Sequence, residues 1–154
     1  MTTLNTLDPC GRIHMPIGII NTVDQLKTFV EAEGSFSPGC GSYGVYVWVY
    51  DREEQRLFAP TVPDVPVTYG VHPRGYLIPW SRWQSEGVTV TTHVCQVSQD
   101  SPCGLVHVVG SRVSLENTRA TPKSLSLYVV IRPLGPAGFP IHELTARELS
   151  LIHI

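Results

Sequence analysis

The sequence Gly104–Pro133, GLVHVVGSRVSLENTRATPKSLSLYVVIRP, decides the fold class of this chain. In its first half, most residues of one parity between 105 and 115 are apolar, and in its second half every second residue from 125 to 131 is apolar. A period of two is typical of β-strands with one buried and one wetter face. Residues 116–123 contain turn formers and no apolar run, so they predict the turn of a β-hairpin. Because a hairpin of this length is not stable alone, a second sheet must cover its apolar face.

Size and composition indicate a single globular domain. The 154 residues are 42% hydrophobic and 16% charged, which is typical of a folded chain. The net charge is −2 and the basic residues are scattered, so we expect no nucleic-acid partner. No apolar run approaches the ~20 residues of a membrane-spanning helix, so we expect no membrane partner.

The N-terminal sequence and the cysteines both give information on the cellular compartment of the protein. The sequence MTTLNTLDPCGRIHMPIG has no basic segment followed by a long apolar core, so it predicts no signal peptide. If residue 1 is the natural start, we expect a cytoplasmic protein. Cys95 and Cys103 flank a turn and could face each other across a hairpin, but a disulfide there would need an oxidising compartment. We therefore favour free thiols at all four cysteines: Cys10, Cys40, Cys95 and Cys103.

Further alternating segments supply the cover that the hairpin needs. The strongest is Gly44–Asp51, where valines alternate with aromatic residues, and it predicts a second hairpin with 56–59. Weaker alternation predicts three more strands, over 12–20, 26–32 and 87–98. The segment 26–32 has a short helix capped by Asp24 as its alternative. Many strands, little helix and frequent Gly and Pro turns favour an all-β fold, an antiparallel β-sandwich.

Residues 60–87 have no clear period and are rich in proline and aromatic residues. A long irregular segment is uncommon in a compact domain and is often functional. Aromatic rings beside Arg, His and Gln suit sugars, but the same composition suits a domain interface, which we favour slightly. The candidate carbohydrate or interface contacts are Tyr69, His72, Arg74, Tyr76, Trp80, Arg82 and Trp83.

The sequence contains no catalytic signature and no metal-ligand spacing, so we expect no catalytic residue, no metal and no cofactor. Two histidines and two cysteines do lie close in sequence: His93, Cys95, Cys103 and His107. Their spacing is unlike that of zinc ligands, and ordinary packed or surface residues are favoured. Glu31 and Glu33 share a strand parity and could approach a ligand, but an exposed strand end is the favoured interpretation.

We expect three parts along the chain. Residues 1–11 are a loose lead-in and residues 12–148 form the β-sandwich domain, which we expect to be incomplete. Residues 149–154, LSLIHI, match the translation of a common transposon-end oligonucleotide and are treated as a non-native tail, with a native apolar tail as the alternative. If the natural reading frame continues past Glu148, the part that carries the function is missing from this sequence.

Three stretches together carry a resemblance to a known family. They are 36–39 with 44–51, then 80–83 with 86–90, then VSLENT at 113–118, which leads through Pro122 to an alternating strand at 125–127. They resemble the N-terminal β-sandwich domain of bacterial carbohydrate-active enzymes that have an (α/α)6 barrel. These enzymes are the glycogen-debranching and glucoamylase-like hydrolases and the disaccharide phosphorylases. The resemblance covers about residues 26–145 and includes no catalytic motif.

The resemblance implies a non-catalytic domain. In that family the catalytic carboxylates lie on the helical barrel, and no position here matches them. The sandwich packs against the barrel and helps to shape its substrate pocket. We therefore expect the N-terminal domain of a glycoside hydrolase or phosphorylase, with the downstream catalytic domain as its partner. The alternative is a self-contained carbohydrate-binding or structural module whose aromatic residues between Tyr69 and Trp83 stack on a sugar.

Overall fold

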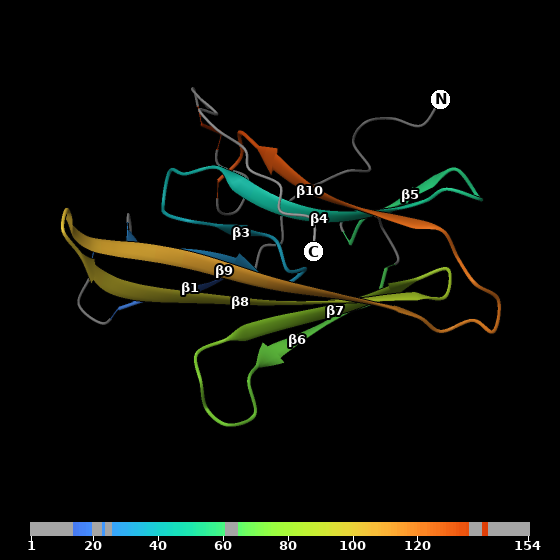
Figure 1. Ribbon diagram of the computed structural model, residues 1–154, viewed down its shortest axis with the longest axis horizontal. Helices are drawn as coiled ribbons and strands as arrows, with labels where there is room; N and C mark the ends of the chain where they lie inside the picture. Colours follow the sequence, from blue (N-terminus) through green and yellow to red (C-terminus); the bar gives the residue numbers. More distant parts are fainter. Residues whose placement is uncertain (1–13, 20–22, 24–25, 61–64, 136–139, 142–154) are drawn as a thin grey trace.

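The computed structural model describes residues 14–19, 23, 26–60, 65–135 and 140–141. In these residues the chain forms β-strands in two antiparallel sheets (Figure 1). The predicted all-β, antiparallel sandwich is therefore confirmed. No helix that is long and apolar enough to cross a membrane occurs in this part of the chain. The expected lead-in 1–11 and tail 149–154 lie outside the described residues.

The six-stranded sheet is built around β4 (Gly44–Asp51). Its other strands are β1 (His14–Ile17), β2 (Thr28–Glu31), β3 (Phe36–Ser37), β5 (Arg56–Phe58) and β10 (Leu125–Arg132). One edge of β4 pairs with β10 along its whole length, and the other edge pairs with β3 and β5. The predicted hairpin between 44–51 and 56–59 is confirmed by the pairing of β4 with β5.

The four-stranded sheet is a meander in which each strand pairs with the next along the chain. Its strands are β6 (Val67–Val71), β7 (Pro79–Ser85), β8 (Val88–Ser101) and β9 (Gly104–Asn117). The expectation of an irregular segment over 60–87 is therefore wrong, because β6 and β7 form a hairpin inside it. The period of β7 is hidden in the sequence because a small polar residue, Ser81, occupies a buried position beside Trp83.

The predicted hairpin between 104–115 and 125–131 is also wrong, although both segments are strands. β9 pairs with β8, and β10 pairs with β4 of the other sheet. The link 118–124 is long enough to cross the ~10 Å between two packed sheets. β8 is the better partner for β9 because a tight turn at Pro102 and Cys103 brings fourteen residues of each strand into register.

The core lies between the two sheets. Valines of β4, such as Val47 and Val49, meet Trp83 of β7 and two valines of β8. The Trp83 side chain is only 1% exposed. A second cluster lies toward the β1 edge and contains Ile17, Val30, Phe36 and Val94. The inward valines of β4 and β8 alternate with residues of the opposite face, as the period of two in these segments indicated.

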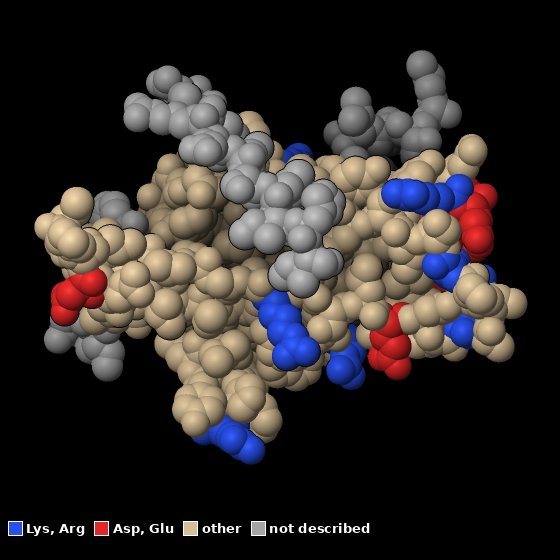
Figure 2. Space-filling model, in the orientation of Figure 1, with Lys and Arg blue, Asp and Glu red and all other residues tan. Residues whose placement is uncertain are grey.

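Charged side chains gather at one end of the sandwich, where the link 118–124 passes from sheet to sheet (Figure 2). This end cluster consists of Asp51, Glu54, Arg56, Glu86, Arg119 and Lys123. Lys123 Nζ lies 2.6 Å from Asp51 Oδ2 and 3.0 Å from Glu54 Oε1. Arg119 pairs with Glu54 and with Glu86, which lies in the turn between β7 and β8. The cluster therefore fastens the link to both sheets.

We expect the Asp51→Asn variant to unfold at a lower urea concentration than the wild type at pH 7. The hydrogen bond from Lys123, followed by the backbone N–H of Glu54, holds the pKa of Asp51 below its ordinary value. A carboxyl group with a lowered pKa in the fold stabilises it above about pH 3.9 and loses that contribution as the pH falls further. The two proteins should therefore become more similar in stability as the pH falls below about 3.9, as measured by urea unfolding.

The Asp51→Asn, Lys123→Met double variant is the control. The single variant leaves the buried Lys123 ammonium without its nearest carboxylate, and the double variant removes that unpaired charge. The double variant should therefore be more stable than the single variant at pH 7. Equal loss of stability in the single variant at pH 7 and at pH 3 would contradict the role assigned to this pair.

Candidate functional site

The outer face of the four-stranded sheet carries polar and cationic side chains. Ser81 and Trp83 of β7 point into the core, so their neighbours in sequence point outward. The strand register places four outward positions in one row across the sheet: Gly70, Trp80, His93 and Arg112. The row therefore brings an aromatic ring, an imidazole and a guanidinium group together.

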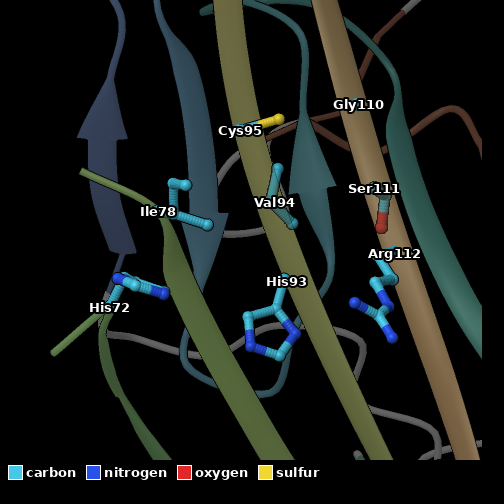
Figure 3. A pocket seen from close by; sticks show the side chains of 8 residues that line it. All are labelled: His72, Ile78, His93, Val94, Cys95, Gly110, Ser111 and Arg112. Carbon is cyan, nitrogen blue, oxygen red and sulfur yellow. The ribbon is translucent and has the colours of Figure 1, made fainter. Parts of the chain in front are cut away.

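A pocket of ≈ 440 Å³ opens on this face (Figure 3). It is lined by His72, Ile78, His93, Val94, Cys95, Gly110, Ser111 and Arg112. Cys95 and Gly110 lie toward one end of the pocket, and His93 and Arg112 lie toward the other. Gly110 widens it, because a Cβ at this position would lie 3.3 Å from Cys95 Sγ.

The loop between β6 and β7 positions His72 at the side of the pocket. The His72 N–H donates to the Ile78 carbonyl at 3.0 Å, and the Gly75 N–H donates to the His72 carbonyl at 3.0 Å. Gly75 has a φ of +79°, which favours glycine at this turn. The Tyr76 ring packs on the His72 ring with centroids 5.4 Å apart. His72 is therefore held by a closed loop whose ends are hydrogen-bonded.

His93 lies in the most unusual electrostatic surroundings of the site. Its Nδ1 atom is buried and has no hydrogen-bond partner within the described part of the chain. Burial lowers the pKa of His93, and the positive charges of Arg112, His72 and Arg82 lower it further. No carboxylate is among the residues that line the pocket. At neutral pH the site therefore combines an uncharged imidazole with a guanidinium group, an arrangement suited to binding a polar or anionic molecule.

The structure separates the histidines and cysteines that are close in sequence. His93 and Cys95 face outward, whereas the inward His107 has its Nδ1 2.7 Å from Ser98 Oγ. Cys103 is exposed in the turn between β8 and β9. Among the described residues, no three His, Cys, Asp or Glu side chains are grouped so that they could hold a metal ion.

The prediction of free thiols is confirmed for three of the four cysteines. Cys40, Cys95 and Cys103 are free, and two of them are exposed. Cys95 is half-buried and pairs across the strands with Gly110, so it does not face Cys103. Cys10 lies outside the described residues.

The seven predicted contact residues occupy different places. His72 lines the outer pocket, Tyr76 packs on it, and Arg74 is exposed in the same loop. The Trp80 ring lies over Gly70 and its Nε1–H donates to the Val71 carbonyl at 3.1 Å. Exposed Arg82 donates from Nε to Thr91 Oγ1 at 3.2 Å. Trp83 is buried in the core, so its ring offers no face to a ligand or to a neighbouring domain.

A second, smaller pocket contains two of the predicted residues. Tyr69 and Trp80 line it together with His14 and Glu31, and its volume is ≈ 90 Å³. The expectation that Glu31 and Glu33 form an exposed strand end is wrong, because both are 7% exposed. They are buried because β2 lies between β1 and β3 and the following turn packs on the other sheet. Two aromatic residues and an acidic residue thus line the same small pocket at the edge of the sandwich.

Sequence reasoning did not select Arg112 or Gly110 as site residues. The alternation of 104–115 places Arg112 on the parity opposite Val109, Val113 and Leu115, which is a weak sign of an outward position. Its neighbour His93 belongs to a different strand, and only the register between β8 and β9 brings the two together. The role of Gly110 depends on the same register, because it lies opposite Cys95.

Comparisons with known proteins find no matching family model, no matching curated protein and no matching solved structure.

We expect the Trp83→Ala variant to lose about 3–5 kcal/mol of unfolding free energy, because the substitution empties the centre of the core. The Trp80→Ala variant should lose less, because that ring lies on the outer face over Gly70. Urea unfolding followed by circular dichroism measures both. Equal losses in the two variants would contradict the different burial of the two rings.

We expect the fold to lose stability as the pH falls below about 6.5, the ordinary pKa of histidine, because burial and nearby positive charges lower the pKa of His93 in the fold. The unfolded chain then binds a proton at His93 more readily than the folded chain does, so the free energy of unfolding falls. The His93→Gln variant should show a smaller loss between pH 7 and pH 5 or so. An NMR titration of the His93 ring that gave a pKa at or above 6.5 would contradict this expectation.

Proposed function

We propose that this chain is a non-catalytic β-sandwich domain of a carbohydrate-active enzyme, and that it packs on a helical catalytic domain through the open side of its sandwich. One observation carries the packing: inward-facing apolar side chains remain exposed along the edge strands of the two sheets. We define the open side by four of them: Leu115 of β9 and Leu127, Val129 and Ile131 of β10.

The open side is clearest where β10 runs beside β4. Val129 pairs with Val47, so both side chains point to the same face of the sheet. Val47 is 7% exposed, whereas Val129 is 64% exposed. Leu127 and its partner Val49 show the same contrast, at 43% and 0%. The core is therefore filled beneath β4 and uncovered beneath β10, and an uncovered apolar surface of this kind is typical of an interaction site.

The edge strands that frame the open side are β9 and β10. Within the described residues, β9 pairs with β8 and β10 pairs with β4, so one edge of each strand has no strand beside it. Figure 1 shows the two strands in separate sheets, joined at one end by the link 118–124. The unpaired N–H and C=O groups of an exposed strand edge readily pair with another segment or are covered by one, which supports a neighbouring domain on this side.

The assignment to carbohydrate-active enzymes draws on the resemblance of three sequence stretches and on the chemistry of the outer face. Aromatic, imidazole and guanidinium groups on one sheet face suit sugar C–H faces and hydroxyls, and Trp80, His93 and Arg112 share one row of the outer face. The free thiols at Cys40, Cys95 and Cys103 are in keeping with a cytoplasmic protein.

A self-contained carbohydrate-binding module is the second candidate, and the aromatic residues at the smaller pocket favour it. Tyr69 and Trp80 line that pocket, and Tyr69 is 53% exposed, so its ring is accessible for stacking on a sugar. Trp83 is excluded from such a platform because it belongs to the core.

The proposal is tested by cysteine labelling at two adjacent positions of β10. In a background without other cysteines, Val129→Cys lies on the open side and Tyr128→Cys lies on the opposite face. In the isolated domain both cysteines should react with a maleimide, because both positions are exposed. In a protein extended by the natural reading frame past Glu148, the cysteine at position 129 should be protected and the one at 128 should stay reactive.

The same reading frame separates the two candidates. A continuation that encodes repeated amphipathic helices, together with protection at position 129, supports the enzyme domain. A stop codon soon after Glu148 supports the binding module. Equal reactivity at positions 128 and 129 in the extended protein would overturn the packing proposal.

A further inference from the structure

The outer pocket has an unbalanced positive charge. Arg112 makes no ion pair within the residues that the structure describes, unlike the basic side chains of the end cluster. His72 and His93 lie near it, and the lining includes no acid. The next acid on the same face of β9 is Glu116, which lines a different hollow of the sheet. A guanidinium group without a carboxylate partner on a sheet face is a ready site for an anion.

The unpaired imidazole nitrogen of His93 also indicates an anionic ligand. His93 Nδ1 has no partner in the described chain, and buried polar atoms normally have one. The positive charges of Arg112, His72 and Arg82 disfavour a proton on His93. An anion in the pocket would offset these charges and would accept a hydrogen bond from the imidazole.

The size and walls of the pocket say what else the ligand must contain. Its ≈ 440 Å³ lies within the range of sites for small organic molecules, roughly 300–1,000 Å³, and exceeds what a bare phosphate fills. Ile78, Cys95 and the unobstructed backbone at Gly110 provide an uncharged wall away from Arg112. The site therefore suits a molecule with a charged group at one end and an uncharged remainder at the other.

We propose that this pocket binds a small organic oxyanion, a phosphate ester or a carboxylate, whose charged group lies between Arg112, His93 and His72. Arg112 supplies paired N–H donors, and the two imidazoles add single donors. The uncharged part of the ligand lies against Ile78 and Cys95. This binding activity does not depend on whether the chain belongs to a carbohydrate-active enzyme.

The test is an NMR titration with inorganic phosphate and with phenyl phosphate at constant ionic strength. Phosphate should shift the amide signals of β8 and β9 around His93 and Arg112, and it should raise the pKa of His93. Phenyl phosphate should bind more tightly than phosphate because its ring covers the wall at Ile78. A third titration with benzoate compares a carboxylate with the phosphate ester. Whichever of benzoate and phenyl phosphate binds more tightly identifies the class of ligand that the pocket prefers.

The variants make the test specific. Arg112→Gln should weaken phosphate binding about tenfold or more, and Arg112→Lys should weaken it less, because lysine keeps the charge but not the paired donors. Arg52→Gln is the matched control: it removes one positive charge in the turn between β4 and β5, where Arg52 bonds Ser126. The amide spectrum of each variant reports whether it is folded.

Two results would overturn the proposal. Equal phosphate affinity in Arg112→Gln and Arg52→Gln would show binding to the general surface. Phenyl phosphate that binds no more tightly than phosphate would reduce the site to one for a simple ion. Neither result affects the proposal that the open side packs on another domain, because that proposal is tested by labelling the cysteine at position 129. The two proposals can therefore be overturned independently.

Discussion

The contact between Lys123 and Asp51 is the constraint on which the arrangement of the two sheets depends. Its partners lie 2.6 Å apart, and both side chains are buried. Asp51 ends β4 and accepts hydrogen bonds from the backbone of Glu53 and Glu54, while Lys123 belongs to the link that carries the chain between sheets. A buried ion pair adds little net stability but penalises every arrangement that separates its partners. We infer that it selects the path of the link.

That path determines which strands become neighbours. With the link held at the end of β4, β10 runs back along β4, and the Arg52 N–H donates to the Ser124 carbonyl at 2.9 Å at the start of the pairing. β9 remains with β8 in the other sheet. The same constraint fills the core beneath β4 and leaves Leu127 and Val129 uncovered, so the open side is a consequence of how the chain crosses between sheets.

The outer pocket depends on a different constraint, the register of the meander. Tight turns at 86–87 and 102–103 set that register, and Glu86 and Gly87 both have positive φ values, +48° and +77°. Because side chains alternate along a strand, a slip of one residue would turn His93 and Arg112 into the core. The pocket is thus as well specified as the core beneath it, although its residues are polar.

The sequence by itself determined the all-β class, the extent of strands such as Gly44–Asp51 and the separation of its valines and aromatic residues onto opposite faces. These features follow from alternation within one strand, which is a local property of the chain. The sequence did not reveal the hairpin within 60–87, where Ser81 in a buried position and Gly70 in the outer row conceal the period. Only the tertiary structure decided that β9 and β10 lie in opposite sheets, that Trp83 is a core residue and that His93 lies beside Arg112. Alternation says which face a residue takes but not which strand lies next to it, and both the open side and the pocket are made by neighbours that are distant in sequence.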